Sequence, residues 1–312
     1  MKNLKFVFFI LFVAIAALFL FISMQKHPQT SSKPTVAVTT FALYDITQHI
    51  AGDTLDVVNI LPFGVDPHSF EPTPELMIKL QKSAIVFYSG AGLEPWTHGF
   101  HFPHKELNIS QYVHLRQLSK EEEHEEEHGA DAHHHENGLD PHYWLDFDNM
   151  KRATDVITEE LVKLLPKNKP IYEANKRRYI AMLDNLDASY KIALTGCKND
   201  TVVMSHNALG YVARKYHFKV ASLSGLSPEA DPSAQDVNRI FNDIKEQGID
   251  TIFFENFVND KLIKTIAHDA KIKFELFEPL GNITADEAKA GATYEEIMKK
   301  NLKKLQEALQ CR

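Results

Sequence analysis

Short apolar runs alternate with segments of helical spacing along most of this 312-residue chain. The apolar runs stand at 35–40, 56–62, 84–90, 201–206, 218–223, 249–256 and 272–277. Helical patterns lie between them, for example at 43–52 and 231–248, and both of these end on a glycine. Short apolar runs that alternate with helices are typical of parallel strands, so the pattern predicts an α/β fold.

One helical segment is longer than the others. Residues 169–195 contain no glycine, and their only proline is Pro170, at the start. After Gly196 the alternation of strands and helices begins again. We therefore predict two α/β lobes with parallel sheets, at 34–168 and 196–312, joined by the helix at 169–195.

The composition changes abruptly at 119–137. The stretch SKEEEHEEEHGADAHHHEN has almost no apolar side chains and cannot contribute to a core, so we predict a solvated loop inserted in the first lobe. Its histidines are interleaved with acidic residues: His124, His128, His133, His134 and His135. Imidazoles and carboxylates are good donors for divalent metals, and a segment that must be ordered on binding holds them weakly. The loop is therefore predicted to hold auxiliary, weaker metal sites.

The first 33 residues have the features of an export signal. Lys2 and Lys5 precede an apolar run from Phe6 to Ile22, and a polar stretch follows it. We therefore expect a periplasmic protein. The run also approaches the length of a membrane span, and no A-x-A-like triplet follows it, so an uncleaved N-terminal anchor stays open.

The chain has two cysteines, Cys197 and Cys311. In an exported protein, two cysteines predict one disulfide, and two buried free thiols are the alternative. The formal net charge of −8 argues against nucleic acid as a partner and suits a cationic ligand.

A motif of Gly, an apolar residue and Asp-Pro-His occurs twice, in GVDPHSF (64–70) and GLDPHYW (138–144). The proline fixes its own φ angle and restricts the residue before it, which stiffens the backbone ahead of His68 and His142. Such stiffness is useful where a side chain must keep the geometry of a ligand. Asp66 and Asp140 are expected to cap these turns.

Several predicted strands end on a group that binds metals. His68 follows one strand, His206 ends another, and Glu255 and Glu278 stand at the ends of the last two. Ligands of open parallel sheets bind at the carboxyl ends of the strands, so these side chains, with His142, can converge if the lobes face each other. Three imidazoles and a carboxylate form a zinc-type set, and the third imidazole favours zinc over manganese.

Three imidazoles with an open position also occur in zinc hydrolases, where the metal activates a water molecule. The chain has no HExxH motif and no evident general base beside the predicted ligands. A hydrolase therefore ranks below a metal-binding receptor.

Taken together, these motifs resemble those of the metal-binding solute receptors of bacterial ABC uptake systems, in the zinc and manganese cluster. The resemblance extends from about Pro34 to the C-terminus and rests on DPHSFEPTP, GLEPW, DPHYWLD, YEANKRRY, SHNALGY, IFFEN and FEPLG. It implies a zinc-binding receptor, not an enzyme, that holds its metal between two lobes and docks onto a membrane permease and its ATPase. A manganese receptor of the same family is the alternative, and we expect a monomer.

The resemblance also implies roles for individual residues. His68, His142 and His206 match the three imidazole ligands by motif. Glu278 stands where a fourth ligand, commonly Asp, is usual, and a water molecule is the alternative for that position. Glu255 matches an acidic position near the site and is expected to support a ligand from behind and not to bind the metal.

Overall fold

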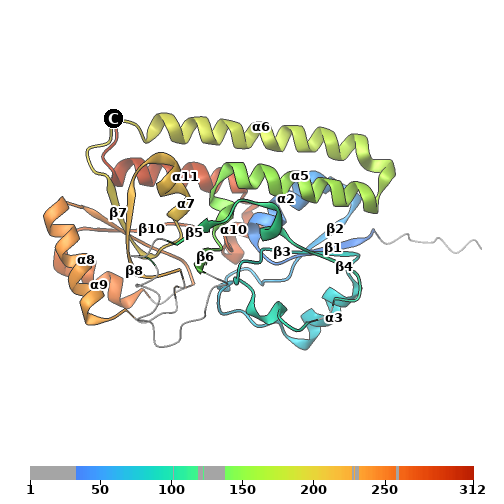
Figure 1. The fold of residues 1–312 in the computed structure, drawn as a ribbon, viewed down its shortest axis with the longest axis horizontal. Helices are drawn as coiled ribbons and strands as arrows, with labels where there is room; N and C mark the ends of the chain where they lie inside the picture. The colour runs from blue at the N-terminus through green and yellow to red at the C-terminus, as the bar shows by residue number, and fades with distance from the viewer. Residues whose placement is uncertain are drawn as a thin grey trace, which may run out of the picture. The chain divides into compact units, whose positions relative to one another are not determined.

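Two four-stranded parallel sheets form the framework of the protein (Figure 1). The first has the order β2-β1-β3-β4, with β1 (Thr35–Val38), β2 (Asp56–Asn59), β3 (Ile85–Tyr88) and β4 (Lys105–Asn108). The second has the order β10-β9-β7-β8, with β7 (Thr201–His206), β8 (Lys219–Ser224), β9 (Thr251–Phe254) and β10 (Lys273–Leu276). The predicted fold class, two α/β lobes with parallel sheets, is confirmed.

The computed structural model describes residues 33–100, 102–118, 122, 138–226, 228, 232–257 and 260–312. The predicted signal or anchor at 1–33 lies outside these residues, except for Lys33. The five loop histidines also lie outside them: His124, His128, His133, His134 and His135. In the part of the chain that is described, no helix combines the length and the apolar character needed to cross a membrane.

Helices accompany both sheets. Those of the first lobe are α2 (Phe41–Ala51), α3 (Pro74–Lys82) and α5 (Phe147–Leu164). Those that follow are α6 (Lys169–Ala193), α7 (Gly210–Tyr216), α8 (Ala234–Gln247), α9 (Lys261–Ala270), α10 (Ala285–Ala290) and α11 (Tyr294–Ala308).

The sequence at the two ends of α8 explains where this helix begins and ends. The hydroxyl of Ser233 accepts the backbone N–H of Asp236 at 3.2 Å, and the Asp236 carboxylate accepts the backbone N–H of Ser233 at 3.0 Å. This reciprocal pair satisfies two N–H groups that the first turn leaves free. Gly248 ends the helix at φ +66°, a conformation that glycine adopts without strain. The helix predicted at 231–248 is therefore present.

The long helix α6 lies along both lobes (Figure 1). Its 25 residues extend about 37 Å at 1.5 Å per residue. Near its middle, Tyr179 donates its hydroxyl to Asp45 of α2 at 2.7 Å, and near its end Tyr190 donates to the carbonyl of Met298 in α11 at 2.8 Å. The backbone N–H of Tyr294, which begins α11, also donates to Asp45, at 3.1 Å. Residues of both lobes therefore belong to one continuous hydrophobic core along α6.

A short hairpin that the sequence did not predict brackets the acidic segment. Its strands are β5 (Arg116–Gln117) and β6 (Leu139–Asp140), which pair antiparallel. The hydroxyl of Tyr211 in α7 accepts the backbone N–H of Arg116 and donates to the carbonyl of Asp140, both at 2.8 Å. The hairpin is thus fixed to the second lobe although it belongs to the first.

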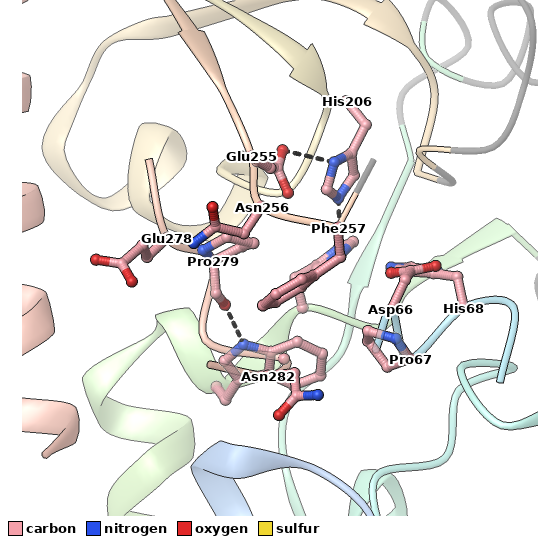
Figure 2. A pocket seen from close by; sticks show the side chains of 13 residues that line it. Asp66, Pro67, His68, His206, Glu255, Asn256, Phe257, Glu278, Pro279 and Asn282 are labelled. Atoms are coloured by element: carbon pink, nitrogen blue, oxygen red, sulfur yellow. Dashed lines mark hydrogen bonds and ion pairs between the residues drawn. The ribbon is translucent and has the colours of Figure 1, made fainter. Parts of the chain in front are cut away.

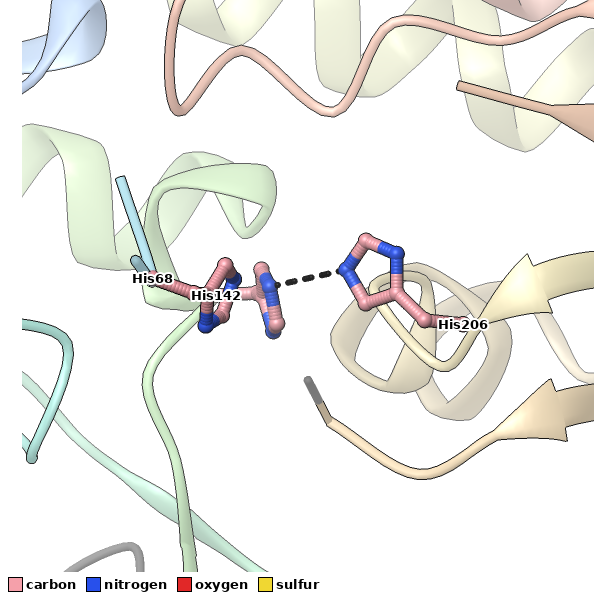
Figure 3. Close-up of side chains that lie close together, drawn as sticks. All are labelled: His68, His142 and His206. Atoms are coloured by element: carbon pink, nitrogen blue, oxygen red, sulfur yellow. Dashed lines mark hydrogen bonds between the residues drawn. The ribbon is translucent and has the colours of Figure 1, made fainter. Parts of the chain in front are cut away.

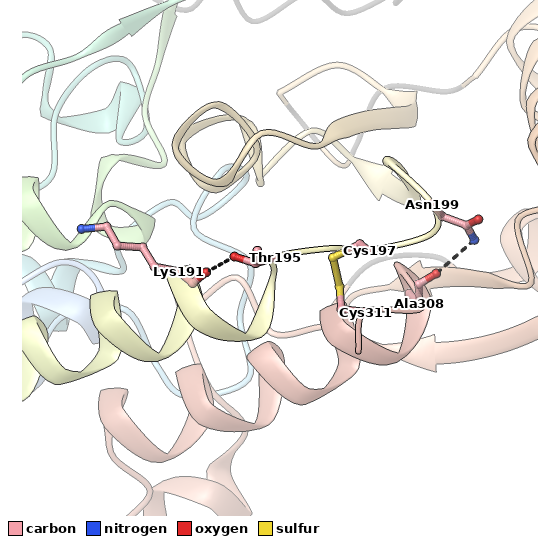
Figure 4. Close-up of a disulfide and its surroundings, with 6 residues drawn as sticks. All are labelled: Lys191, Thr195, Cys197, Asn199, Ala308 and Cys311. Carbon is pink, nitrogen blue, oxygen red and sulfur yellow. Dashed lines mark hydrogen bonds between the residues drawn. A yellow bond between two sulfur atoms is a disulfide. The ribbon is translucent and has the colours of Figure 1, made fainter.

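The predicted disulfide between Cys197 and Cys311 is confirmed (Figure 4). It links the chain just after α6 to the chain just after α11, across a sequence separation of 114 residues. Backbone hydrogen bonds from Lys198 to Gln310 and from Asn199 to Leu309 lie beside it, at 3.3 and 3.0 Å. The bond therefore ties together the two helices on which both lobes pack.

Replacing both cysteines with serine should lower the free energy of unfolding by about 2–4 kcal/mol, because the bond closes a long loop in the unfolded chain. The measurement is guanidinium chloride unfolding of the oxidised protein and the variant. Added reductant should bring the wild-type curve to that of the variant and leave the variant unchanged. A wild-type curve that does not respond to full reduction of the bond would contradict this prediction.

Candidate metal centre

His68 stands on a loop that leaves the end of β2 and is held by the other lobe. The side-chain amide of Asn282, after β10, donates to the carbonyl of Pro62 at 2.7 Å and to that of Val65 at 2.8 Å. The loop therefore cannot shift without breaking two hydrogen bonds to the second lobe. The stiff Asp-Pro pair before His68 restricts the backbone further.

His142 follows β6 and is oriented by Asp140. One oxygen of Asp140 accepts the backbone N–H of His142 at 2.9 Å and lies 2.9 Å from the ring Nδ1. The other oxygen accepts from the guanidinium of Arg116 at 2.7 and 3.0 Å. Asp140 thus caps its turn, as expected, and also holds the imidazole. Asp66, in the matching position of the first motif, accepts the hydroxyl of Ser69 at 3.2 Å.

His206 ends β7, and Glu255 follows the neighbouring strand β9. Because these strands are parallel and adjacent, both side chains emerge at the same edge of the sheet. An oxygen of Glu255 lies 2.6 Å from Nδ1 of His206 and also accepts the hydroxyl of Ser205 at 3.1 Å. Glu255 therefore contacts the histidine from behind, in the place predicted for it.

The three imidazoles converge on one point (Figure 3). One possible ligand atom from each ring lies within 4.8 Å of those of the other two. The ring centroids are 5.2 to 5.7 Å apart, and the side chains of His68, His142 and His206 are all buried. The structure thus brings together the three histidines that the sequence singled out.

Two of the rings face each other through their Nε2 atoms, which lie 3.3 Å apart. The carboxylates of Asp140 and Glu255 lie 2.9 and 2.6 Å from the two Nδ1 atoms, which favours the tautomer with its proton on Nδ1 and leaves Nε2 as the ligand atom. Burial lowers the pKa of His142, which favours its neutral form. Burial also lowers the pKa of His206, but the Glu255 carboxylate outweighs that effect and the pKa is raised. A proton or a metal ion can therefore occupy the gap, and the two compete.

The cavity around the imidazoles has room for one small species. The volume of the cavity is about 30 Å³, which is enough for one ion or one water molecule. Trp144 and Phe257 line it, and the indole N–H of Trp144 donates to the carbonyl of Pro279 in the other lobe at 2.6 Å (Figure 2). A direct hydrogen bond between the lobes thus lies beside the cavity.

The structure does not bring the carboxylate of Glu278 to the imidazoles. Glu278 lines the same cavity, but its carboxylate points away from His206 and His68 (Figure 2). Burial and the neighbouring carboxylate of Glu287 raise its pKa to about 7. Its role as a fourth ligand therefore stays a prediction.

Sequence reasoning did not find Arg116, which neutralises the carboxylate behind His142. It stands 24 residues before Asp140, and nothing in the local pattern marks the pairing. Of the acidic segment at 119–137, the structure describes Glu122, whose carboxylate accepts from Arg116 at 2.8 and 2.9 Å.

Comparisons with known proteins agree with this geometry. Residues 36–308 match the family model described as zinc-uptake complex component A, periplasmic (ZnuA). The chain is 32% identical over 312 residues to the high-affinity zinc uptake system protein ZnuA of Bacillus subtilis, across 95% of this chain and 96% of that protein. It is 31% identical over 303 residues to the zinc-binding lipoprotein AdcA of Streptococcus pneumoniae, across 96% of this chain.

The chain spans only 60% of the length of that AdcA. Among solved structures, the Zn(II)-bound ZnuA-like domain of Streptococcus pneumoniae AdcA superposes with a TM-score of 0.73 at 28% identity. That alignment covers 89% of this chain and 99% of the domain. The chain therefore belongs to the ZnuA family of zinc-uptake components, whose members are solute-binding receptors and not enzymes.

Proposed function

We propose that this protein is an exported receptor that binds one zinc ion between its lobes and delivers it to the permease and ATPase of an ABC importer. The observation that carries the proposal is the pair of Nε2 atoms of His142 and His206, 3.3 Å apart, with a carboxylate behind each ring. Two lone pairs repel each other at this distance unless a cation lies near both. His68 supplies the third donor.

The donor set favours zinc over manganese. Three neutral imidazoles suit zinc, whereas manganese prefers sites richer in carboxylate and water oxygen. Glu278 reaches the metal only if its side chain rotates away from Glu287, and otherwise a water molecule completes the coordination. The small volume of the cavity supports a receptor for a single ion. The named relatives, a zinc uptake protein and a zinc-binding lipoprotein, also support zinc as the cargo and an exported location.

The way in which the two lobes are held together around the site suits the capture and release of a metal ion. The first lobe contributes the imidazoles of His68 and His142 and the second that of His206, while α6 and α11 hold the two lobes on a shared core. Small movements of the lobes can then separate His206 from His142 without unfolding either sheet. This is the behaviour we expect of a receptor that hands its ion to a permease.

The metal-free protein should bind about one zinc ion tightly, and His142→Ala combined with His206→Ala should abolish that binding. We expect a loss larger than the roughly 10- to 100-fold typical of removing a group behind a ligand. The measurement is titration against a competing chelator. His268→Ala is the control, because that side chain is 87% exposed and outside the cluster. Tight binding that survives the double substitution would refute the site.

Zinc affinity should fall as the pH is lowered, because protons compete for the imidazoles. The Glu255 carboxylate raises the pKa of His206, so the folded site takes up this proton at a higher pH than a free imidazole. In Glu255→Gln that pKa should drop, and the pH at which affinity falls should move down. The measurement is zinc affinity between pH 5 and 9. An unchanged pH dependence would contradict the assignment of Glu255.

We also propose that the acidic histidine segment holds further, weaker zinc sites. Deletion of 123–136 keeps Glu122 and should lower the number of zinc ions bound at saturation while the tight site remains. Equilibrium dialysis with zinc analysis measures both quantities. An unchanged stoichiometry would count against metal binding by this segment.

A further inference from the structure

A buried guanidinium near the metal centre is shared by two carboxylates. Arg116 is 7% exposed and donates to Asp140 with its Nε and Nη2 and to Glu122 with its Nη1. Asp140 in turn holds the ring of His142. Three contacts therefore connect Glu122 to a proposed ligand, and Glu122 shares the charge of Arg116 with Asp140.

The same carboxylate also reaches the other lobe. The side-chain N–H of Asn207 donates to Glu122 at 2.8 Å. Asn207 is buried and directly follows His206, and its backbone N–H donates to the carbonyl of Gly225 at 2.8 Å. One side chain thus contacts the partner of His142 in the first lobe and the neighbour of His206 in the second.

The surrounding backbone is shaped around this contact. A Cβ atom on Gly210, at the start of α7, would lie 1.9 Å from a guanidinium nitrogen of Arg116. Glycine is therefore required there for the guanidinium to reach both carboxylates. The ring of Tyr211 also lies 5.9 Å from the guanidinium carbon, within cation–π distance. Residues of the second lobe therefore pack against the buried guanidinium, to which the carboxylate of Glu122 is bound.

We propose that Glu122 is a positioning residue that bridges the two lobes behind the metal centre and slows release of the ion. This inference rests on the proposed function of the three histidines. Separation of the lobes would break the bond between Glu122 and Asn207, so the bridge opposes the movement that parts His142 from His206. Glu122 also draws part of the Arg116 charge away from Asp140, which leaves Asp140 the stronger acceptor for His142.

Stopped-flow measurement of zinc release to a chelator tests the bridge in the full chain. Glu122→Gln should release zinc about 5-fold faster, the size expected when the net contribution of one typical hydrogen bond is lost. Asn207→Leu, which keeps the shape of the side chain, should have a similar effect. The double variant should be no faster than the faster of the two single variants, because both changes weaken the same contact. Glu106→Gln is the control, since Glu106 is exposed on β4 and outside this network.

The visible absorption bands of Co²⁺ bound in place of zinc give a second readout. They should shift in Glu122→Gln, because Arg116 then pairs with Asp140 alone, and should stay unchanged in Asn207→Leu. A release rate and a spectrum like those of the wild type in Glu122→Gln would overturn the proposal. A double variant that releases zinc about 25-fold faster, the product of two independent 5-fold effects, would also overturn it. Failure of the proposed function appears differently, as tight zinc binding that survives loss of His142 and His206.

Discussion

Two imidazole nitrogens held 3.3 Å apart set the requirements for much of this structure. Each ring can offer its Nε2 only if its Nδ1 proton has an acceptor, which Asp140 and Glu255 supply. A buried carboxylate in turn needs its own partners, and Asp140 has the guanidinium of Arg116. The polar groups behind the site are thus consequences of placing imidazoles where one cation can join them.

The second requirement is that imidazoles from different lobes keep their separation. Both lobes pack on α6 and α11, and the bond between Cys197 and Cys311 joins the ends of these helices. The indole of Trp144 and the amide of Asn282 add direct bonds between the lobes beside the cavity. The shared core and the disulfide therefore hold the two lobes together along α6 and α11. Movement of the lobes would break the polar contacts beside the metal centre.

The sequence predicted the parts of this arrangement that leave a local pattern. Apolar runs marked seven of the eight strands of the two sheets, and the repeated Asp-Pro turns marked His68 and His142. Strand β4 was missed because it is an exposed edge strand, with Leu107 as its buried residue, and has no apolar run. The pairing of Arg116 with Asp140 spans the acidic segment and leaves no local signal. No spacing rule places Glu287 beside Glu278, where its carboxylate helps to raise the pKa of Glu278.

A crystal structure of the protein with one equivalent of zinc, with anomalous data on both sides of the zinc edge, tests the central claim most directly. The account predicts one ion between the lobes, bonded to His68 and to the Nε2 atoms of His142 and His206 at about 2.0–2.1 Å. It also predicts that Asp140 and Glu255 stay on the Nδ1 atoms behind. An ion bound by fewer than these three imidazoles, or located outside the cavity, would contradict it.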